Sequence, residues 1–285
     1  MPGIQNGIGT TFRRAAFGGT PPLTPSYPAD LYSDMSFAYG LIKASSTYSG
    51  DCLEIQRDSD GAYNTVGFAA NGIADLSGVL TWAGSDTVRV TKVYDTTGNG
   101  NTAQNGTVAT QVILASGGSL NLYDNQLWFD QKWYRIVTGG TNTPYNAANL
   151  DTYTVYSPQD STGGHSIGIT CALINRGFSM VGDATGSSPH LNFGSPTYYQ
   201  DGSLVSWTTR TAVRNGAIVP LQRTQLSVLG GAPTGQFNLY INIGGSGDFD
   251  FKVRGGMTVW GWVKDTSSER TGIEALLNDK VNITV

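Results

Sequence analysis

A motif that could carry nucleophilic catalysis occupies residues 164–168, GHSIG, which match the G-x-S-x-G pattern of serine hydrolases. In those enzymes the serine lies on a strand–turn–helix elbow, and an aspartate and a histidine follow it in the chain. Here Ser166 begins the apolar run SIGITCALI, and the only later histidine, His190, lies in the next predicted strand. We therefore interpret the motif as a glycine-flanked strand and predict no catalytic residue in it.

A second group of residues could bind a metal ion. Asp58, Asp60 and Gly61 resemble part of a calcium loop. An EF-hand also needs flanking helices and a glutamate at the twelfth loop position, and both are missing here. The favoured interpretation is a turn without a metal or other cofactor, and a structural Ca²⁺ at the rim of a β-sandwich is the alternative.

Aromatic side chains could hold a sugar, since six tryptophans occur and 11% of the residues are aromatic. Rings exposed on a concave sheet stack on sugars, whereas most large aromatic residues pack in cores. Trp260 and Trp262 are two residues apart, so they share one face of a predicted strand. They are the candidates for a sugar or partner contact, with core packing as the favoured alternative.

The elements that must position these residues are mostly strands. Residues 236–244 and 256–265 alternate between apolar and polar side chains with period two. Asp201-Gly202 is a dipeptide typical of tight hairpin turns. Further strands are predicted within 53–57, 64–69, 87–94, 121–129, 151–157, 166–173, 189–193 and 203–209. This pattern predicts an all-β fold, a two-sheet antiparallel jelly-roll sandwich.

Two helices are predicted at the ends of this β region. In residues 33–44 Ser33 can cap a helix, and the apolar residues roughly follow one helical face. Near the C-terminus, Thr266 and Glu269 form a capping-box pattern ahead of an apolar stripe at helical spacing. The expected organisation is an extended arm, residues 1–30, followed by a jelly-roll domain, residues 31–285.

Composition excludes several classes of protein. The formal charge is −4 and the basic residues are scattered, so no surface for nucleic acid is expected. No apolar run approaches the ~18 residues of a membrane-spanning helix. The N-terminus lacks the apolar segment of a signal peptide, and Cys52 and Cys171 are too few for a disulfide framework. We expect buried free thiols in a protein made inside the cell.

The stretch VTKVYDTTGNGNTAQNG, residues 91–107, stands out because small polar residues follow a strand directly. Together with residues 37–82, this stretch resembles the N-terminal part of the arabinofuranosidase B catalytic domain family. The residues that carry the resemblance are Tyr48, Gly50, Ile55, Arg57, Ser59, Asp60, Val66, Gly67, Phe68, Tyr94, Asp95, Gly98, Asn99 and Gly100. The resemblance implies a concanavalin A-like, laminin-G-like jelly roll.

The same resemblance implies that Asp95, Gly98, Asn99 and Gly100 form a compact structural turn. Its side chains are expected to bond the backbone while the glycines take positive φ. The family's nucleophile glutamate has no counterpart, because the chain's glutamates are Glu54, Glu269 and Glu274, with none between the first two. An aspartate pair such as Asp183 and Asp201 is supported by proximity in sequence alone. Since glycoside hydrolysis ordinarily needs two carboxyl groups, no arabinosidase activity is expected.

Sequences with this pattern are also similar to bacteriophage virion proteins. On that basis we expect a non-enzymatic structural protein of a phage particle, displayed on the head or tail, with other virion proteins as partners and a homo-oligomer, a trimer, as its form. The alternative is a carbohydrate-active enzyme or a lectin-like protein that binds a cell-surface glycan. The arm would attach the protein to its particle through Ile4, Ile8, Phe12, Arg13, Arg14 and Phe17.

Overall fold

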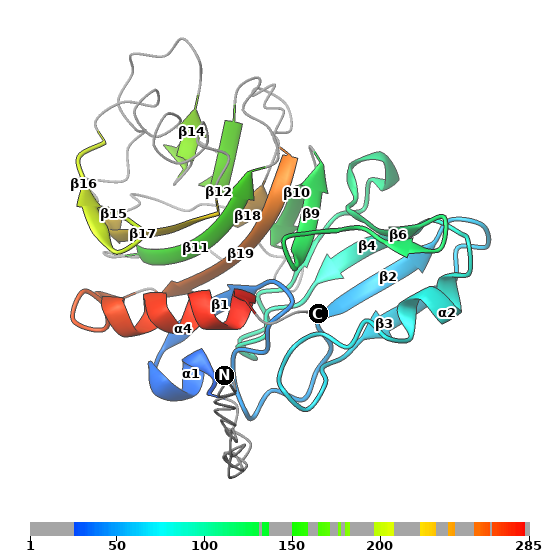
Figure 1. Cartoon of the computed structure of the whole chain (residues 1–285), viewed down its shortest axis with the longest axis horizontal. Helices are drawn as coiled ribbons and strands as arrows, with labels where there is room; N and C mark the ends of the chain where they lie inside the picture. Colours follow the sequence, from blue (N-terminus) through cyan, green and yellow to red (C-terminus); the bar gives the residue numbers. More distant parts are fainter. Residues whose placement is uncertain are drawn as a thin grey trace, which may run out of the picture.

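The computed structural model describes residues 26–130, 133–136, 150–158, 165–171, 176–177, 180–182, 197–207, 223–231, 239–242, 254–262 and 264–282. In these residues antiparallel strands form two sheets, with few helices (Figure 1). The predicted all-β sandwich is confirmed. The arm residues Ile4, Ile8, Phe12, Arg13, Arg14 and Phe17 and the strand predicted at 189–193 lie outside the described residues.

The first sheet has the order β16-β15-β17-β11-β19-β9-β8, and β1 also pairs with β19. Asp201 and Gly202 join β15 to β16 with φ values of 48° and 79°, so the predicted tight hairpin turn is present. The strands are β1 (Met35–Tyr39), β8 (Leu122–Tyr123), β9 (Gln126–Asp130), β11 (Leu150–Pro158), β15 (Thr197–Gln200), β16 (Ser203–Val205), β17 (Thr224–Gly231) and β19 (Arg254–Trp262).

The second sheet has the order β13-β12-β18-β10-β5-β4-β2-β3, with β14, β6 and β7 attached to it. Its strands are β2 (Leu53–Arg57), β3 (Tyr63–Val66), β4 (Val88–Val93), β5 (Ala103–Gln104), β6 (Ile113–Ser116), β7 (Ser119–Leu120), β10 (Trp133–Ile136), β12 (His165–Cys171), β13 (Arg176–Gly177), β14 (Met180–Gly182) and β18 (Leu239–Asn242). The helical elements are α1 (Pro28–Leu31), α2 (Val79–Ala83), the 3-10 turn η1 (Val108–Thr110) and α4 (Arg270–Asn282).

Two buried apolar clusters hold these layers together. The larger one lies between the sheets and joins Leu53, Ile55 and Val90 to Phe37 and Val259. The smaller one lies on the other face of the first sheet, where α4 covers it (Figure 1), and it consists of Met35, Ala38, Ile42, Ala44, Ile73, Tyr153, Val155, Leu229, Trp260, Trp262, Ile273, Leu277 and Val281. Strand β19 is therefore buried on both faces.

The helix predicted in residues 33–44 is wrong, because this segment forms β1. Phe37 belongs to the cluster between the sheets, whereas Met35 and Ala38 belong to the cluster under α4. A strand buried on both faces has apolar residues at most positions, and such a run is easily mistaken for one face of a helix. At Gly40, with φ 141°, a Cβ would lie 2.8 Å from the side chain of Thr258.

The C-terminal helix is confirmed as α4, but the predicted capping box does not form. The backbone N–H and hydroxyl of Thr266 donate instead to the buried carboxylate of Asp151, at 2.6 and 2.8 Å. Helix α4 begins four residues later, at Arg270. Thr266 therefore ties the start of the helix to β11.

Helix α1 spans the boundary expected between arm and domain at residues 30 and 31. The carboxylate of Asp30 accepts hydrogen bonds from the Ser45 hydroxyl at 3.0 Å and from the Ser46 backbone at 3.1 Å. Asp30, which the prediction places at the end of the arm, therefore contacts Ser45 and Ser46 of the predicted domain. No helix in the described ranges is long and apolar enough to span a bilayer.

Candidate functional site

A groove of about 660 Å³ lies on the outer face of the second sheet. Side chains alternate along β2, so that Leu53 and Ile55 enter the core while Glu54 and Gln56 face the groove. The residues that line it come from β2–β5 and from the loop after β5, and they are Glu54, Gln56, Tyr63, Thr91, Lys92, Gln104, Asn105, Gly106, Val108 and Gln111. The groove is thus formed by neighbouring strands and one loop.

A β-bulge aims the charged residues at the centre of this groove. Glu54 pairs with Lys92, but the next residue, Ile55, pairs with Val90, so Thr91 is the extra residue in β4. Lys92 Nζ lies 2.8 Å from Glu54 Oε2, and the Thr91 hydroxyl donates to Glu54 Oε1 at 2.8 Å. The bulge therefore lets two consecutive residues of one strand hold a single carboxylate, a use typical of bulges at functional sites.

The Glu54–Lys92 pair makes the centre of the groove polar without net charge. The hydrogen bond to Glu54 raises the pKa of Lys92 above its ordinary value of 10.5, so the ammonium stays protonated at neutral pH. The two side chains are 20% and 35% exposed. Both are therefore accessible to a ligand in the groove.

The same face carries a row of paired polar residues across four strands. Thr65 on β3 pairs with Glu54, Glu54 with Lys92, and Lys92 with Gln104 on β5. Directly paired residues of antiparallel strands project to the same side of the sheet. Tyr63, which pairs with Gln56, is 62% exposed and adds an aromatic ring to this face.

The loop after β5 closes the groove and is held by its own side chains. The Asn105 amide donates to the Thr110 carbonyl at 2.9 Å and accepts from the Thr107 backbone at 2.9 Å. The Gln111 amide donates to the Asn105 carbonyl at 2.7 Å. Gln111 is only 2% exposed, and its Oε1 has no hydrogen-bond partner among the described residues. Within the described part of the chain, a buried amide oxygen behind the wall of the groove is thus left without a partner.

The lining supports binding better than hydrolysis. It offers one carboxylate, one ammonium and the accessible amides of Gln56 and Gln104, all of which bond hydroxyl groups well. Among the described lining residues Glu54 is the only carboxylic acid, and it is paired with Lys92. Glycoside hydrolysis by the usual route needs two carboxyl groups.

The polar turn predicted after β4 has contacts that extend beyond itself. The buried carboxylate of Asp95 accepts from the backbone of Ala38, Thr97 and Asn101 and from the Thr97 hydroxyl. Asn99 donates to the carbonyls of Met35 and Ser36 at 2.7 and 3.2 Å. Gly98 and Gly100 have φ of 92° and 79°. The turn therefore bonds the edge of β1 that β19 leaves open.

Trp260 and Trp262 are not available to a sugar. They are 1% and 0% exposed and belong to the cluster beneath α4, where Trp262 packs edge-on against Tyr153 with ring centroids 5.4 Å apart. Of the two interpretations, the structure shows core packing, the favoured one, and excludes the candidate sugar or partner contact at this pair. The alternation of the strand was correct, but the sequence does not show that α4 covers this face.

The other candidate residues have structural partners. Ser166 lies within β12, so GHSIG forms no strand–turn–helix elbow. The carboxylates of Asp58 and Asp60 pair with Arg89 and Arg57 at 2.9 and 2.5 Å. Within the described ranges no cluster of three His, Cys, Asp or Glu residues could hold a metal ion. Asp183 lies outside the described residues.

The glutamates of the C-terminal helical region also have partners. The Glu274 carboxylate accepts from Ser227 and Arg270, at 2.7 Å in each case, and is buried. Glu269 lies 3.6 Å from Lys264. Neither residue lines the groove.

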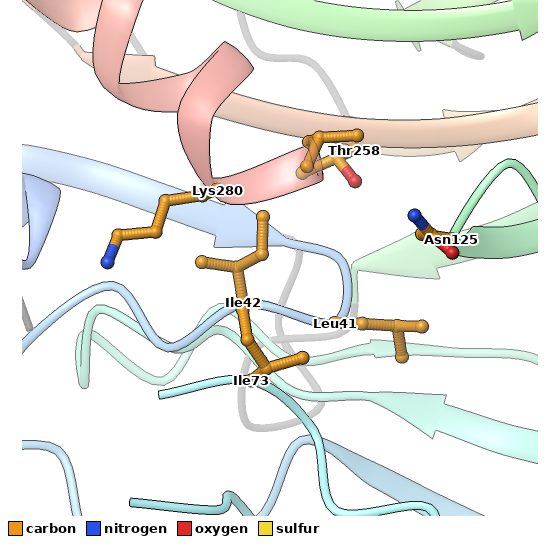
Figure 2. A pocket seen from close by; sticks show the side chains of 7 residues that line it. Leu41, Ile42, Ile73, Asn125, Thr258 and Lys280 are labelled. Carbon is orange, nitrogen blue, oxygen red and sulfur yellow. The ribbon is translucent and has the colours of Figure 1, made fainter. Parts of the chain in front are cut away.

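A small cavity lies between β1, β19 and the end of α4. Leu41, Ile42, Ile73, Thr258 and Lys280 surround it (Figure 2), and its free space is about 10 Å³. This volume is about that of a single water molecule. The cavity is therefore a packing feature and too small for a ligand site.

The fold is similar to that of solved arabinofuranosidases. The structures are a glutamate-to-glutamine mutant of a GH54 α-L-arabinofuranosidase soaked with 4-nitrophenyl α-L-arabinofuranoside (TM-score 0.55, 13% identity), a GH54 α-L-arabinofuranosidase soaked with a cyclic sulfate inhibitor (0.52, 14%) and an arabinofuranosidase complexed with arabinofuranosyl-α-1,2-xylobiose (0.53, 14%). Each match covers 88% of this chain and 64% of the other. No family model and no curated protein matches the sequence.

The expected role as a structural protein of a phage particle is contradicted by these similarities. The three similar structures are arabinofuranosidases, and none of them is described as a virion protein. The error arose because the jelly-roll pattern specifies how strands pack, which is common to proteins of unrelated function. The chain has the β-sandwich fold seen in GH54 arabinofuranosidases and spans 64% of the length of those proteins.

Proposed function

We propose that this chain is a carbohydrate-active protein that binds a glycan in the groove over β2–β5. One observation carries the proposal: Glu54, Lys92 and the amide side chains share this groove with the exposed ring of Tyr63. Hydroxyl groups both donate and accept hydrogen bonds, so a sugar matches a lining that holds carboxylate, ammonium and amide groups together. An aromatic ring complements the apolar face of a sugar ring.

The fold suggests which sugars to test first. Two of the similar structures are described with ligands that contain arabinofuranose. At 13% and 14% identity this likeness concerns the fold, so the sugar is part of the proposal. We propose glycans that contain arabinofuranose as the ligand class.

The test is calorimetric titration of the full chain with arabinofuranosyl-xylobiose, comparing wild type with Lys92→Met. Removing the ammonium deletes a charge-assisted hydrogen bond, so affinity should fall by tenfold or more. Folding stability should change by less than about 1 kcal/mol, because a partly exposed ion pair stabilises little.

Lys264→Met is the matched control. Lys264 is 28% exposed and pairs with Glu269 at 3.6 Å, outside the groove. Its loss should leave sugar affinity unchanged. An absence of binding to any arabinofuranose-containing glycan, or equal affinities for wild type and Lys92→Met, would overturn the proposal.

Hydrolysis of an arabinofuranoside is the second candidate function, favoured by the fold of the similar enzymes. Among the described residues the groove contributes one carboxylate, so a two-carboxylate reaction would need a second carboxyl group from another part of the chain. Release of 4-nitrophenol from 4-nitrophenyl α-L-arabinofuranoside tests this function. If the chain releases 4-nitrophenol, the Glu54→Gln variant shows where hydrolysis occurs. A variant with weaker glycan binding but unchanged hydrolysis would show that hydrolysis takes place at a site other than the groove.

A further inference from the structure

We infer that the ligand of this groove is an uncharged oligosaccharide that lies across the strands, with one sugar stacked on Tyr63. The inference rests on the proposed glycan binding and specifies its ligand. The length of the groove, the charge of its lining and its two exposed apolar side chains support this ligand.

The groove is longer than one sugar. Its lining extends from Tyr63 on β3 across β2 and β4 to Gln104 on β5, and it includes Val108 in the loop that follows β5. Neighbouring strands are about 4.8 Å apart, so the four strands alone span roughly 14 Å. A single sugar ring is much shorter than this span. A monosaccharide bound at Glu54 and Lys92 therefore leaves the ends of the groove empty.

The lining carries no net charge. Glu54 and Lys92 are its only charged residues within the described part of the chain, and they neutralise each other at 2.8 Å. A uronic acid or a sulfated sugar would bring a negative charge close to the Glu54 carboxylate without an unpaired cation to bind it. The pair therefore favours neutral sugars and disfavours anionic ones.

The two most exposed apolar residues of the lining lie on opposite sides of β2: Tyr63 belongs to β3, and the Val108 carbonyl accepts a hydrogen bond from Arg89 of β4 at 3.2 Å. Tyr63 is 62% exposed and Val108 is 51% exposed. The turn before Tyr63 is fixed by the Gln56 amide, which donates to the Gly61 carbonyl at 3.2 Å, and by the Arg57–Asp60 ion pair. A turn that is fixed before binding loses little backbone entropy when a ligand contacts Tyr63. An oligosaccharide could cover both residues at once, whereas a single sugar could not.

The experiment measures the affinity of the full chain for a series of neutral arabinose oligosaccharides, from one to four sugars, for wild type and Tyr63→Ala. Wild-type affinity should rise with length until the ligand spans the groove. Tyr63→Ala should weaken the longer ligands by roughly three- to tenfold, the worth of one aromatic contact, and leave the monosaccharide unchanged. Leu204→Ala is the control, because Leu204 is 66% exposed on β16 in the other sheet.

The outcomes separate the inference from the proposed function. Affinity that does not depend on length, or that Tyr63→Ala does not change, overturns the inference and leaves glycan binding standing. Equal or tighter binding of oligosaccharides of a uronic acid overturns the neutral-ligand assignment. If no saccharide of any length binds, the proposed function itself is wrong, and the inference is lost with it.

Discussion

The backbone N–H of Ala38 donates a hydrogen bond of 3.1 Å to the carboxylate of Asp95, fifty-seven residues further along the chain. Ala38 lies in β1, which pairs with β19 along one edge. On its other edge β1 is bonded by the turn, because the Thr96 N–H donates to the Ala38 carbonyl at 3.1 Å. The turn thus satisfies backbone groups that would otherwise be buried without partners.

Replacing Asp95 by asparagine should destabilise the fold by about 1–3 kcal/mol. The carboxylate is 2% exposed and accepts from three backbone N–H groups and one hydroxyl. An amide would turn an NH₂ group toward some of these donors. Urea unfolding measures the loss, and Asp75→Asn is the control, because Asp75 is exposed and caps only Ser77. Equal losses in both variants would show that the contact with β1 adds nothing.

The same residue predicts a pH dependence. Burial raises the pKa of Asp95 above its ordinary value of 3.8, and the hydrogen bonds only partly oppose this rise. Between 3.8 and the raised pKa the folded state holds a proton that the unfolded state has released. The stability that Asp95 contributes is therefore fully present below 3.8 and declines as pH rises through the folded pKa. Urea unfolding across this range measures the effect. As pH rises, wild type should lose more stability than Asp95→Asn, which has no carboxyl group at this position. A wild type that instead gains stability relative to the variant as pH rises would refute the raised pKa.

Gly98→Ala should lower stability by about 1 kcal/mol or more, because φ is 92° and a side chain is strained in that region. Space is not the cause, since the nearest atom to a Cβ there would be Tyr48 Cδ2 at 3.8 Å. Gly78→Ala is the matched control: it is equally open, but its φ is −85°. Comparing the melting temperatures of the two variants isolates the cost of the backbone conformation at position 98. A Gly98→Ala variant that melts at the same temperature as Gly78→Ala would contradict this cost.

The sequence pattern predicts strands that are buried on one face only, and it misses elements whose structure depends on residues far away in the chain. Strands β2 and β4 have one face in the core and one outside, so their period of two is visible. Strand β1 is buried on both faces and therefore carries no such period. Predicting the groove would also require the register of the strands, because only the bulge at Thr91 brings both Thr91 and Lys92 against Glu54.

Trp262→Phe should lower stability by about 1–3 kcal/mol, because it leaves a gap in a fully buried cluster and removes the hydrogen bond from its indole N–H to the Tyr32 carbonyl at 3.3 Å. Glycan affinity should stay unchanged, since the indole is 0% exposed. Trp82→Phe is the control: Trp82 is half-buried at the edge of the larger core cluster and stacks with Arg57, a contact worth about 0.5–1 kcal/mol. If a folded Trp262→Phe variant binds sugar more weakly than wild type, the prediction is wrong and Trp262 contributes to ligand binding.

Gly261→Ala should be among the most destabilising single changes in β19. Gly261 pairs directly with Phe37 of β1, and a Cβ at 261 would lie 2.0 Å from Cζ of that ring. The ring is fully buried, so it can only move by disturbing its neighbours, and overpacking of this kind costs about 1–3 kcal/mol or more.

Phe37→Leu alone should also destabilise, because it leaves a cavity. In the double variant the smaller side chain makes room for the new methyl group. Its loss of stability should therefore be smaller than the sum of the two single losses, by at least about 0.5 kcal/mol. Urea unfolding of the four proteins measures this coupling, and strictly additive losses would show that the Phe37 ring is not what restricts position 261.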